Sequence, residues 1–332
     1  MSFDHSISRR NVFKGAGGLA VASALGAGAA LGATTPAHAA GLDVVEHQTY
    51  GRMEYYKVST PSIAWKPRVN VLLPDGYDSG RRYPVLYLLH GGAQNFMKFD
   101  KEDDIRGLTA GRDLIVVMPD GGIAGWYCNP VTANLGPRNW ETFHIEELIP
   151  WVDATFRTFP EQAGRAVSGF SMGGFGALKY NAKYSNYFAS VSAHSGPANL
   201  RSHNYAVVRW ANVSSALVEL NGGTIYGAPK PFWHQDLISA DNPMENLESY
   251  RNKRIFLVSG NNKDIINFQI VGIISSALNE YFVRETQHEF TAALDSAGIK
   301  YERYEEQGGH FVRPERLQQD IDGIVAHLRK AE

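Results

Sequence analysis

Apolar and β-branched residues recur along the chain in short runs, and turn-forming residues bound each run. Such runs are typical of strands that are buried on both faces of a sheet. The clearest are Val69 to Leu73, Val85 to Leu89, Leu114 to Met118, Ala166 to Ser168, Ala189 to Ser192 and Ile255 to Val258. We therefore expect a sheet whose central strands are covered on both sides.

Segments with helical character lie between these runs. Apolar residues recur along one side of a helix from Phe143 to Phe156, and the segment from Ser171 to Tyr184 begins with small residues and continues with good helix formers. Strands that alternate with helices predict an α/β fold with a doubly wound, mostly parallel sheet and helices on both faces. In such sheets, chemistry is expected in the crevice at the carboxyl ends of the strands.

One stretch departs from this alternation. Residues 199–250 show weak periodicity and contain Gly222-Gly223, Pro229 and Pro231. We interpret this stretch as a small cap-like insertion over the crevice. The chain has no repeats or long linkers, so residues 40–332 are predicted to form one domain.

The first 39 residues have the pattern of an export signal. Paired arginines, Arg9 and Arg10, precede an uncharged Gly/Ala-rich stretch from Gly15 to Ala33, and Ala37-His38-Ala39 supplies small residues at a cleavage site. This pattern resembles a twin-arginine signal, although Val12 stands where phenylalanine is usual. We expect a mature chain that begins at Ala40, has no stable transmembrane span and is secreted or held in the cell envelope. The alternative is a retained membrane anchor, for which the many glycines are unsuitable.

Composition narrows the function classes. The chain of 332 residues is 44% hydrophobic and carries a formal net charge of −2, which is not the basic balance of a nucleic-acid-binding protein. Its single cysteine, Cys128, excludes an intramolecular disulfide and any zinc site built from several thiolates. An ordinary globular enzyme or binding protein remains.

The sharpest chemical signal is Gly169-Phe170-Ser171-Met172-Gly173, between a predicted strand and a predicted helix. It matches the G-x-S-x-G pattern in the context that the pattern requires. Small residues two positions either side of the serine allow a tight turn that exposes the Ser171 hydroxyl as a nucleophile. The N–H of Met172, at the start of the helix, would stabilise negative charge on an attacked carbonyl.

A second oxyanion donor is expected after an earlier strand. Tyr87-Leu88-Leu89 leads into His90-Gly91-Gly92, and we assign the second N–H to Gly92, because a backbone N–H points into a cavity where no Cβ intrudes. His90 itself is a candidate substrate contact.

A nucleophilic serine needs a general base and an acid that orients the base. His310, in Gln307-Gly308-Gly309-His310-Phe311, follows the strand-like segment from Tyr301 to Tyr304 and is the predicted base. Two acids precede it: Asp264, just past the strand from Ile255 to Val258, and Glu280, at the start of a predicted helix. His194 follows another predicted strand and is a candidate substrate contact.

These motifs together resemble the antigen 85 mycolyltransferases and the related esterase D-like α/β-hydrolases. The resemblance covers nearly the whole of residues 40–332 and rests on the segments Tyr83 to Leu89, Val116 to Pro119, Trp140 to Phe143, Gly169 to Gly173 and Glu280 to Arg284. It implies the α/β-hydrolase fold. In antigen 85 proteins the acid of the triad is a glutamate that opens a segment similar to Glu280-Tyr281-Phe282-Val283-Arg284, so the resemblance favours Glu280 over Asp264.

The chain also departs from that family. Antigen 85 proteins have Asp-Gly-Leu-Arg after the Tyr-Leu-Leu strand, with charged contacts to trehalose, whereas this chain has His90-Gly91-Gly92-Ala93. The family's tryptophan two places after the histidine is Val312 here, a further candidate substrate contact, and the family's disulfide cannot form. The resemblance is therefore closer to the general esterases.

We expect an exported serine esterase or acyltransferase that needs no cofactor or metal and acts on a small-molecule or lipid ester, with water or a carbohydrate as acyl acceptor. Two alternatives are a noncatalytic surface-binding relative and a metallohydrolase that uses His203, His234 and Asp236. A set of aromatic residues could line an acyl groove or belong to the core: Phe96, Phe99, Trp126, Phe232 and Trp233.

Overall fold

A computed structural model describes residues 41–219, 223–227, 233–261 and 271–332 of the chain. Backbone contacts divide the chain into two units, Met1–Thr35 and Pro36–Glu332. The predicted export signal, residues 1–39, lies outside the described residues. The account below concerns the second unit.

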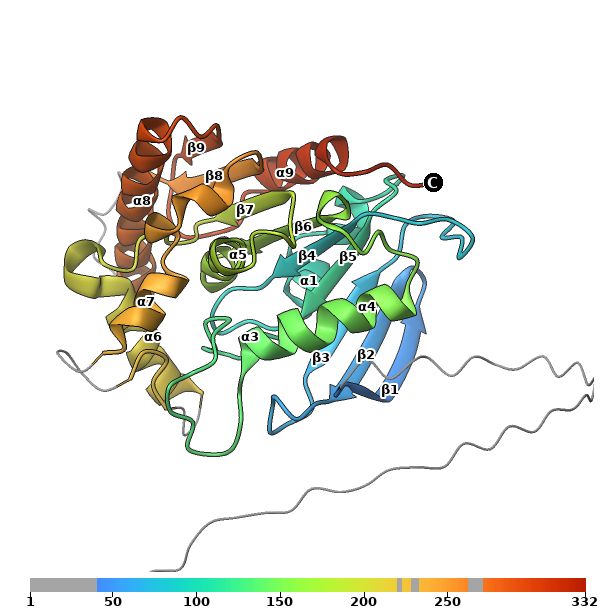
Figure 1. Cartoon of the computed structure of the whole chain (residues 1–332), viewed down its shortest axis with the longest axis horizontal. Helices are drawn as coiled ribbons and strands as arrows, with labels where there is room; N and C mark the ends of the chain where they lie inside the picture. The colour runs from blue at the N-terminus through green and yellow to red at the C-terminus, as the bar shows by residue number, and fades with distance from the viewer. Residues whose placement is uncertain (1–40, 220–222, 228–232, 262–270) are drawn as a thin grey trace, which may run out of the picture. The chain divides into compact units, whose positions relative to one another are not determined.

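The described part of this unit is built on a nine-stranded sheet in the order β1-β2-β3-β5-β4-β6-β7-β8-β9 (Figure 1). The first three strands are antiparallel to their neighbours, and β4 to β9 run parallel to one another. The strands are β1 Asp43–Tyr50, β2 Met53–Ser59, β3 Arg68–Leu72, β4 Val85–Leu89, β5 Ile115–Pro119, β6 Arg165–Phe170, β7 Ser190–His194, β8 Arg254–Gly260 and β9 Glu302–Glu306.

The prediction of a mostly parallel, doubly wound sheet is confirmed. Each apolar run named from the sequence falls on one strand from β3 to β8. The hairpin of β1 and β2 has no counterpart in the sequence interpretation, because β1 is exposed along nearly its whole length and β2 carries buried residues only at intervals. A strand that buries little apolar surface has no continuous apolar run to detect.

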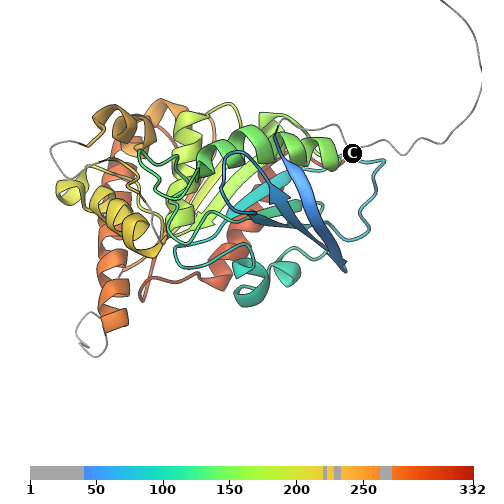
Figure 2. The same ribbon diagram turned by 90° about the horizontal axis from the view of Figure 1, so that it is seen from below.

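Two layers of helices cover the two faces of the sheet (Figures 1 and 2). Alternate residues of β4 show this: Val85, Tyr87 and Leu89 belong to one core cluster, while Leu86 and Leu88 belong to the other. The first cluster includes residues of α3, α4, α5 and α8, and the second includes residues of α1, α2 and α9. These helices are α1 Lys98–Glu102, α2 Ile105–Leu108, α3 Trp140–Thr142, α4 Ile149–Thr155, α5 Met172–Lys183, α8 Val271–Ser296 and α9 Pro314–His327.

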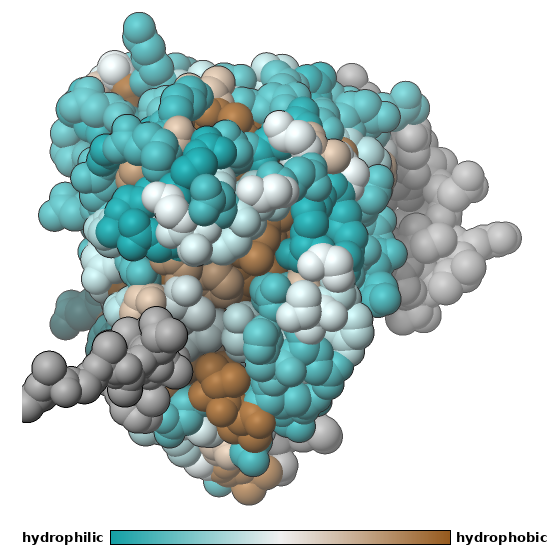
Figure 3. All heavy atoms as spheres, turned by 90° about the vertical axis from the view of Figure 1, so that its right-hand side faces the viewer, coloured by the Kyte–Doolittle hydropathy of each residue, from teal (hydrophilic) through white to brown (hydrophobic). Residues whose placement is uncertain are grey.

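The predicted helix from Phe143 to Phe156 is composite: α3 runs into a π-helical segment, Phe143–Leu148, and then into α4. Residues 199–250, interpreted as a cap, contain α6 Ser202–Val218, α7 Gln235–Asp241 and two 3₁₀ turns, Pro243–Glu245 and Leu247–Tyr250. Helix α6 contacts α8, and α7 contacts α5, on the side toward which the parallel strands point (Figure 1). The face drawn in Figure 3 is mostly hydrophilic, with apolar groups in a few patches.

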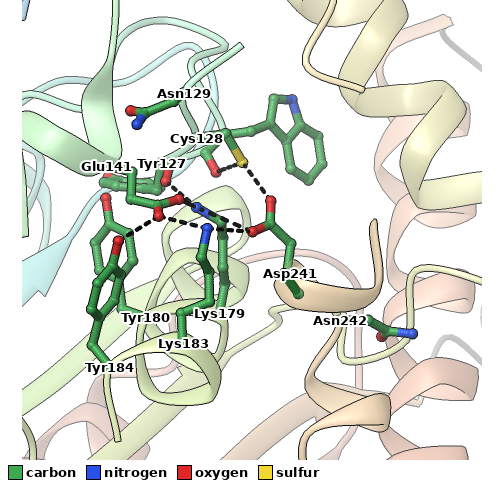
Figure 4. Close-up of polar contacts among 12 residues, drawn as sticks. Tyr127, Cys128, Asn129, Glu141, Lys179, Tyr180, Lys183, Tyr184, Asp241 and Asn242 are labelled. Atoms are coloured by element: carbon green, nitrogen blue, oxygen red, sulfur yellow. Dashed lines mark hydrogen bonds and ion pairs between the residues drawn. The ribbon is translucent and has the colours of Figure 1, made fainter. Parts of the chain in front are cut away.

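A buried ionic cluster joins α5 to α3 and α7 (Figure 4). The Lys179 ammonium group contacts the Glu141 carboxylate and lies 3.8 Å from Asp241, and Lys183 lies 2.6 Å from Glu141 and 3.2 Å from Asp241. Lys179 is fully buried and also donates to the carbonyl oxygen of Tyr127 at 2.8 Å. Tyr184 donates to Glu141 at 2.6 Å. Helix α5 is thus held at the end remote from Ser171.

The protonation states of this cluster follow from its contacts. Burial alone would raise the pKa of Glu141, but the ammonium groups of Lys179 and Lys183 lower that pKa to about 2. Burial would lower the pKa of Lys179, but the carboxylates of Asp241 and Glu141 raise it above its usual value. Removing one member therefore leaves buried charge without its partner.

We expect Lys179→Met to lower the free energy of unfolding by about 3 kcal/mol or more, because the buried carboxyl groups of Glu141 and Asp241 would then have only Lys183 as a cationic partner. Urea denaturation at neutral pH measures this change. The control is Lys57→Met, which removes the partly exposed pair with Glu46 and should change the stability by less than about 1 kcal/mol. Equal losses of unfolding free energy in the two variants would contradict a stabilising role for Lys179 in the buried cluster.

Candidate active site

Ser171 lies at a sharp turn between β6 and α5, with φ of 55° and ψ of −117°. A Cβ on Gly169 would lie 2.3 Å from the carbonyl oxygen of Gly173, and a Cβ on Gly173 would lie 2.1 Å from that of Leu89. Only glycine fits at these two positions, as the sequence pattern predicted. The turn is also held by the Ser171 N–H, which donates to the carbonyl oxygen of His194 at 2.8 Å.

His310 reaches Ser171 from the loop that follows β9. Its Nε2 lies 2.6 Å from the Ser171 Oγ, and its Nδ1 lies 2.5 Å from the Glu280 Oε2. Since an ionised carboxylate only accepts hydrogen bonds, the proton belongs on Nδ1, which leaves Nε2 to accept from the serine hydroxyl. The structure thus brings the predicted nucleophile, the predicted base and one of the two predicted acids into a single hydrogen-bonded chain.

Glu280 is fully buried, and its second oxygen is also occupied. That oxygen, Oε1, accepts from the Ser195 hydroxyl at 2.9 Å and from the Gly260 N–H. A buried carboxylate is tolerated where hydrogen bonds replace its lost water. The three contacts also fix the direction of the carboxylate toward His310. The other acid proposed from the sequence, Asp264, lies outside the described residues.

Hydrogen bonds and close backbone packing hold the loop that carries His310. Arg313 is buried and donates at 3.0 Å to the carbonyl oxygens of Gly309 and Phe311, which flank His310 in sequence. A Cβ on Gly260 would lie 2.3 Å from the carbonyl oxygen of Gly308. Burial lowers the pKa of Arg313, and the nearby Glu280 charge opposes that shift. Arg313 therefore contributes to the position of His310.

The two backbone groups assigned to an oxyanion hole lie on either side of the turn. Met172 is the first residue of α5, where N–H groups have no partner within the helix. In the loop after β4, the N–H groups of Gly91, Ala93 and Gln94 all donate within the described structure, whereas that of Gly92 has no acceptor there. A Cβ on Gly92 would meet only the Ile123 carbonyl oxygen, at 3.7 Å, whereas one on Gly91 would lie 2.9 Å from Phe170 and Gln94.

The histidines proposed as substrate contacts are buried instead. The ring of His90 accepts from the Gly121 N–H through Nε2 at 2.9 Å and lies 2.7 Å from the Gly91 carbonyl oxygen through Nδ1. His194 turns to the far side of β7, where its Nε2 contacts Asp320 at 3.0 Å. Val312 is half-buried and packs against the core cluster that includes Phe170. The burial of His90 and His194 counts against a substrate contact for either histidine, because strand-end residues can point into the core as well as into the crevice. For Val312 the substrate contact stays a prediction.

The remaining sequence candidates are placed as follows. Phe96, Phe99, Trp126 and Trp233 are buried in the protein, and Phe232 lies outside the described residues. No group of metal-ligating side chains large enough to hold an ion occurs in the parts of the chain that the structure describes, and His203 contacts the Ser202 hydroxyl at 2.7 Å. None of the described helices combines the length and apolar composition that a membrane-crossing helix needs.

Sequence reasoning missed Ser195, Gly260 and Arg313. Ser195 stands beside His194 in a segment that the sequence did single out, but the residue expected to matter there was the histidine. Gly260 acts through its backbone N–H, which has no sequence signature. Arg313 is one arginine among many. Each contributes through a contact between segments that are far apart in the chain.

A sheet in this order, with a serine at the turn after β6, defines an α/β-hydrolase. Within that class, the chain belongs to the family described as putative esterase, whose model matches residues 60–328. The chain is 56% identical over 295 residues to Esterase Rv1288 of Mycobacterium tuberculosis (strain ATCC 25618 / H37Rv). That match covers 88% of this chain and 63% of the relative, so the chain spans less than two thirds of the relative's length.

Two solved structures show the fold. M. tuberculosis MPT51 (FbpC1) has a TM-score of 0.65 at 20% identity, with 86% of this chain and 100% of that chain covered. An S-formylglutathione hydrolase from Agrobacterium tumefaciens has a TM-score of 0.64 at 14% identity, with the same coverage of both chains. Both likenesses show the α/β-hydrolase fold that the sequence resemblance implied.

The burial of His90 generates a pH prediction. Burial lowers the pKa of His90 from 6.5 to about 4. Below pH 6.5 the unfolded chain therefore takes up a proton that the folded chain does not bind until about pH 4, so acid favours the unfolded state by up to about 3 kcal/mol through this residue. We expect the stability difference between wild type and His90→Gln to shrink by that amount from pH 7 to pH 4, as measured by urea denaturation. A difference that stays constant with pH would contradict this account.

Proposed function

We propose that the chain is an exported serine carboxylic-ester hydrolase that works through an acyl-serine intermediate. The observation that carries the proposal is the position of His310, 2.6 Å from the Ser171 hydroxyl and 2.5 Å from the buried Glu280 carboxylate. Membership of the putative esterase family supports the same reaction class. No cofactor is required by this chemistry.

In the first half-reaction, Ser171 Oγ bonds to the ester carbonyl carbon while its proton passes to His310 Nε2. Glu280 keeps the imidazolium ion oriented and stabilised. The carbonyl electron pair moves to oxygen, where the N–H groups of Met172 and Gly92 receive the charge. The bond to the alcohol oxygen then breaks, and His310 returns the proton to the alcohol.

In the second half-reaction, water repeats these steps on the acyl-serine. His310 takes a proton from the water as its oxygen bonds to the acyl carbon, and the Ser171 Oγ leaves with that proton. The products are a carboxylic acid and the free enzyme. Acyl transfer would follow the same course with an alcohol, for example a sugar hydroxyl, in place of water.

We favour water as the acceptor. Transfer requires a sugar hydroxyl to be held beside the acyl-enzyme more effectively than bulk water. The charged Asp and Arg that contact trehalose in antigen 85 proteins are replaced here by the His90-Gly91-Gly92-Ala93 segment, and His90 is buried. Both observations support hydrolysis.

The triad is tested with the chain from Ala40 to Glu332 and p-nitrophenyl butyrate. We expect Ser171→Ala to lower kcat by about 10⁴-fold or more, because no other group supplies the nucleophile. Glu280→Gln should lower kcat by about 10²-fold to 10⁴-fold with little change in KM, since a neutral amide no longer stabilises the imidazolium ion. Asp264→Asn is the matched comparison and should retain activity. A larger loss of kcat in Asp264→Asn than in Glu280→Gln would assign the acid role to Asp264.

The same assay decides the acceptor when trehalose is added and the acyl products are identified by mass spectrometry. Free butyric acid as the sole acyl product supports hydrolysis. Butyryl-trehalose would support an acyltransferase. A folded wild-type protein that neither turns over an ester nor is labelled by a fluorophosphonate would favour the noncatalytic relative.

The proposal of export rests on the arginine pair and the Ala37-His38-Ala39 site. We expect the full chain, expressed in a bacterium with twin-arginine export, to be recovered outside the cytoplasm with Ala40 as its first residue, as read by mass spectrometry. Replacing Arg9 and Arg10 together by lysine should retain the uncleaved chain in the cytoplasm. Recovery of a cleaved, exported chain from that double variant would exclude the twin-arginine route.

A further inference from the structure

The peptide group that joins Gly91 to Gly92 makes contacts that bear on the oxyanion. Its N–H is that of Gly92, which has no acceptor among the described residues. Its carbonyl oxygen, that of Gly91, lies 2.7 Å from Nδ1 of the His90 ring and accepts from the Gln94 N–H at 3.3 Å. Because a peptide group is planar, a contact that fixes the direction of its carbonyl oxygen also fixes the opposite direction of its N–H. The direction of the Gly92 N–H therefore depends on His90.

A second peptide group sets the tautomer of the His90 ring. His90 follows β4 and Gly121 follows β5, and these strands are parallel neighbours, so both residues lie at the same edge of the sheet (Figure 1). The N–H of Gly121 donates to Nε2 of His90 at 2.9 Å. A backbone N–H can only donate, so Nε2 carries no proton and the proton of the neutral ring lies on Nδ1. His90 is thus the donor to the Gly91 carbonyl oxygen.

The second peptide group is itself held by a histidine. It joins Asp120 to Gly121, and the Asp120 carbonyl oxygen lies 2.8 Å from Nε2 of His144. A carbonyl oxygen only accepts, so His144 carries its proton on Nε2. Its Nδ1 lies 2.8 Å from the Tyr180 hydroxyl and accepts from it. Tyr180 lies on α5, the helix that begins after Ser171.

These hydrogen bonds form one series that runs in a single direction. Each group donates to the next, and we call the series the oxyanion relay: the Tyr180 hydroxyl, the His144 ring, the peptide of Asp120 and Gly121, the His90 ring, and the peptide of Gly91 and Gly92. Hydrogen bonds that follow one another head to tail polarise each other, so each bond strengthens the next donor. The last donor of the relay is the Gly92 N–H.

Both histidines of the relay are buried. Burial lowers the pKa of His90 to about 4 and the pKa of His144 to about 3, so both rings are neutral at neutral pH. A neutral ring accepts at one nitrogen and donates at the other, whereas a protonated ring donates at both. Each ring lies between a donor and a carbonyl oxygen, so only the neutral form satisfies both neighbours.

Packing restricts the groups of the relay to these orientations. The ring of Tyr127 is buried and packs against both histidine rings, 6.0 Å from that of His90 and 5.4 Å from that of His144. Its hydroxyl donates to the carbonyl oxygen of His90 at 2.9 Å. A Cβ on Gly121 would lie 2.5 Å from the Tyr127 ring, so only glycine lets this peptide group approach so closely.

We propose that the oxyanion relay holds the Gly92 N–H toward the oxyanion and strengthens it as a donor, so that His90, His144 and Tyr180 are positioning residues. The inference rests on the proposed esterase function. No proton moves along the relay during the reaction. The charge that forms on the carbonyl oxygen of the ester is stabilised by an N–H that is already directed at it and does not have to reorient.

The first test replaces His90 in the Ala40 to Glu332 chain, with p-nitrophenyl butyrate as substrate. His90→Phe keeps a ring but removes both nitrogens. We expect it to lower kcat by about 10-fold to 100-fold with KM nearly unchanged, because losing an oxyanion donor outright costs about 10²-fold to 10³-fold and here the donor is only misdirected. His90→Asn should recover most of the lost kcat, since its side-chain amide N–H can replace Nδ1–H as the donor to Gly91.

The second test removes the first donor of the relay. Tyr180→Phe deletes only the hydroxyl and should lower kcat by about threefold, because His144 loses the bond that orients it. Tyr250→Phe is the matched control. Tyr250 is also fully buried and donates to a carbonyl oxygen of α5, that of Leu178, at 2.7 Å, but it does not belong to the relay. We expect its kcat to equal that of wild type.

A trifluoromethyl ketone with a propyl chain separates positioning from a general loss of structure. Ser171 adds to this ketone and forms an oxyanion like that of the reaction. We expect its Ki to rise in each relay variant by the factor by which kcat/KM falls. A variant that loses activity because part of the protein is unfolded keeps the wild-type Ki, since only folded molecules bind the inhibitor. Circular dichroism verifies that each variant is folded.

The possible outcomes are distinct. A kcat that His90→Phe leaves unchanged, or a loss of kcat without a rise in Ki, overturns the inference, while butyrate hydrolysis that Ser171→Ala abolishes keeps the esterase function. If His90→Phe does not fold, equal values of kcat in Tyr180→Phe and Tyr250→Phe overturn the relay. Absence of turnover by wild type, together with no fluorophosphonate labelling, would overturn the esterase function and this inference with it.

Discussion

The turn at Ser171 depends on how closely three pieces of backbone approach one another. The chain before the serine, the first turn of α5 and the end of β4 come so near that a Cβ on Gly169 or Gly173 would lie within 2.3 Å of a carbonyl atom. This approach gives Ser171 its positive φ and lifts its side chain out of the sheet. It also brings the loop with Gly92 next to the start of α5, so both proposed oxyanion donors depend on it. An added methyl group at either glycine would push these three pieces of backbone apart and would displace Ser171 and both proposed oxyanion donors at once.

Once the turn is formed, the histidine and the glutamate have to be brought to it from distant segments. His310 comes from a loop in which Arg313 donates hydrogen bonds to two backbone carbonyl oxygens. Glu280 comes from the long helix α8. The Glu280 carboxylate is saturated by Ser195, Gly260 and His310. Such saturation offsets the cost of burying the charge and restricts the carboxylate to one orientation. The site is therefore organised by hydrogen bonds that join separate segments.

Helix α5 links this site to the rest of the unit. Its first turn follows Ser171, and its last turns carry Lys179 and Lys183 into the buried cluster with Glu141 and Asp241 (Figure 4). Asp241 belongs to α7, in the segment interpreted as a cap, and Glu141 belongs to α3, the first part of the composite helix that continues into α4. The ionic cluster thus ties both segments to the helix that presents the nucleophile. A charge cluster of this kind is specific in geometry because each member must be matched inside the core.

The sequence by itself determined the features that depend on local pattern: the buried central strands, the G-x-S-x-G turn and the histidine loop. The residues left Asp264 and Glu280 open as the acid, the resemblance favoured Glu280, and the structure places the Glu280 carboxylate against His310. Only the tertiary structure decided what depends on the spatial neighbours of a residue. His90 and His194 were expected at the substrate and are buried in hydrogen-bonded networks, while Ser195, Gly260 and Arg313 stand around the triad without any sequence signal. The oxyanion relay joins residues from segments that are distant in the chain. Local periodicity reports which face of an element is apolar, but not which other segment packs against it, so these contacts could be identified only from the folded chain.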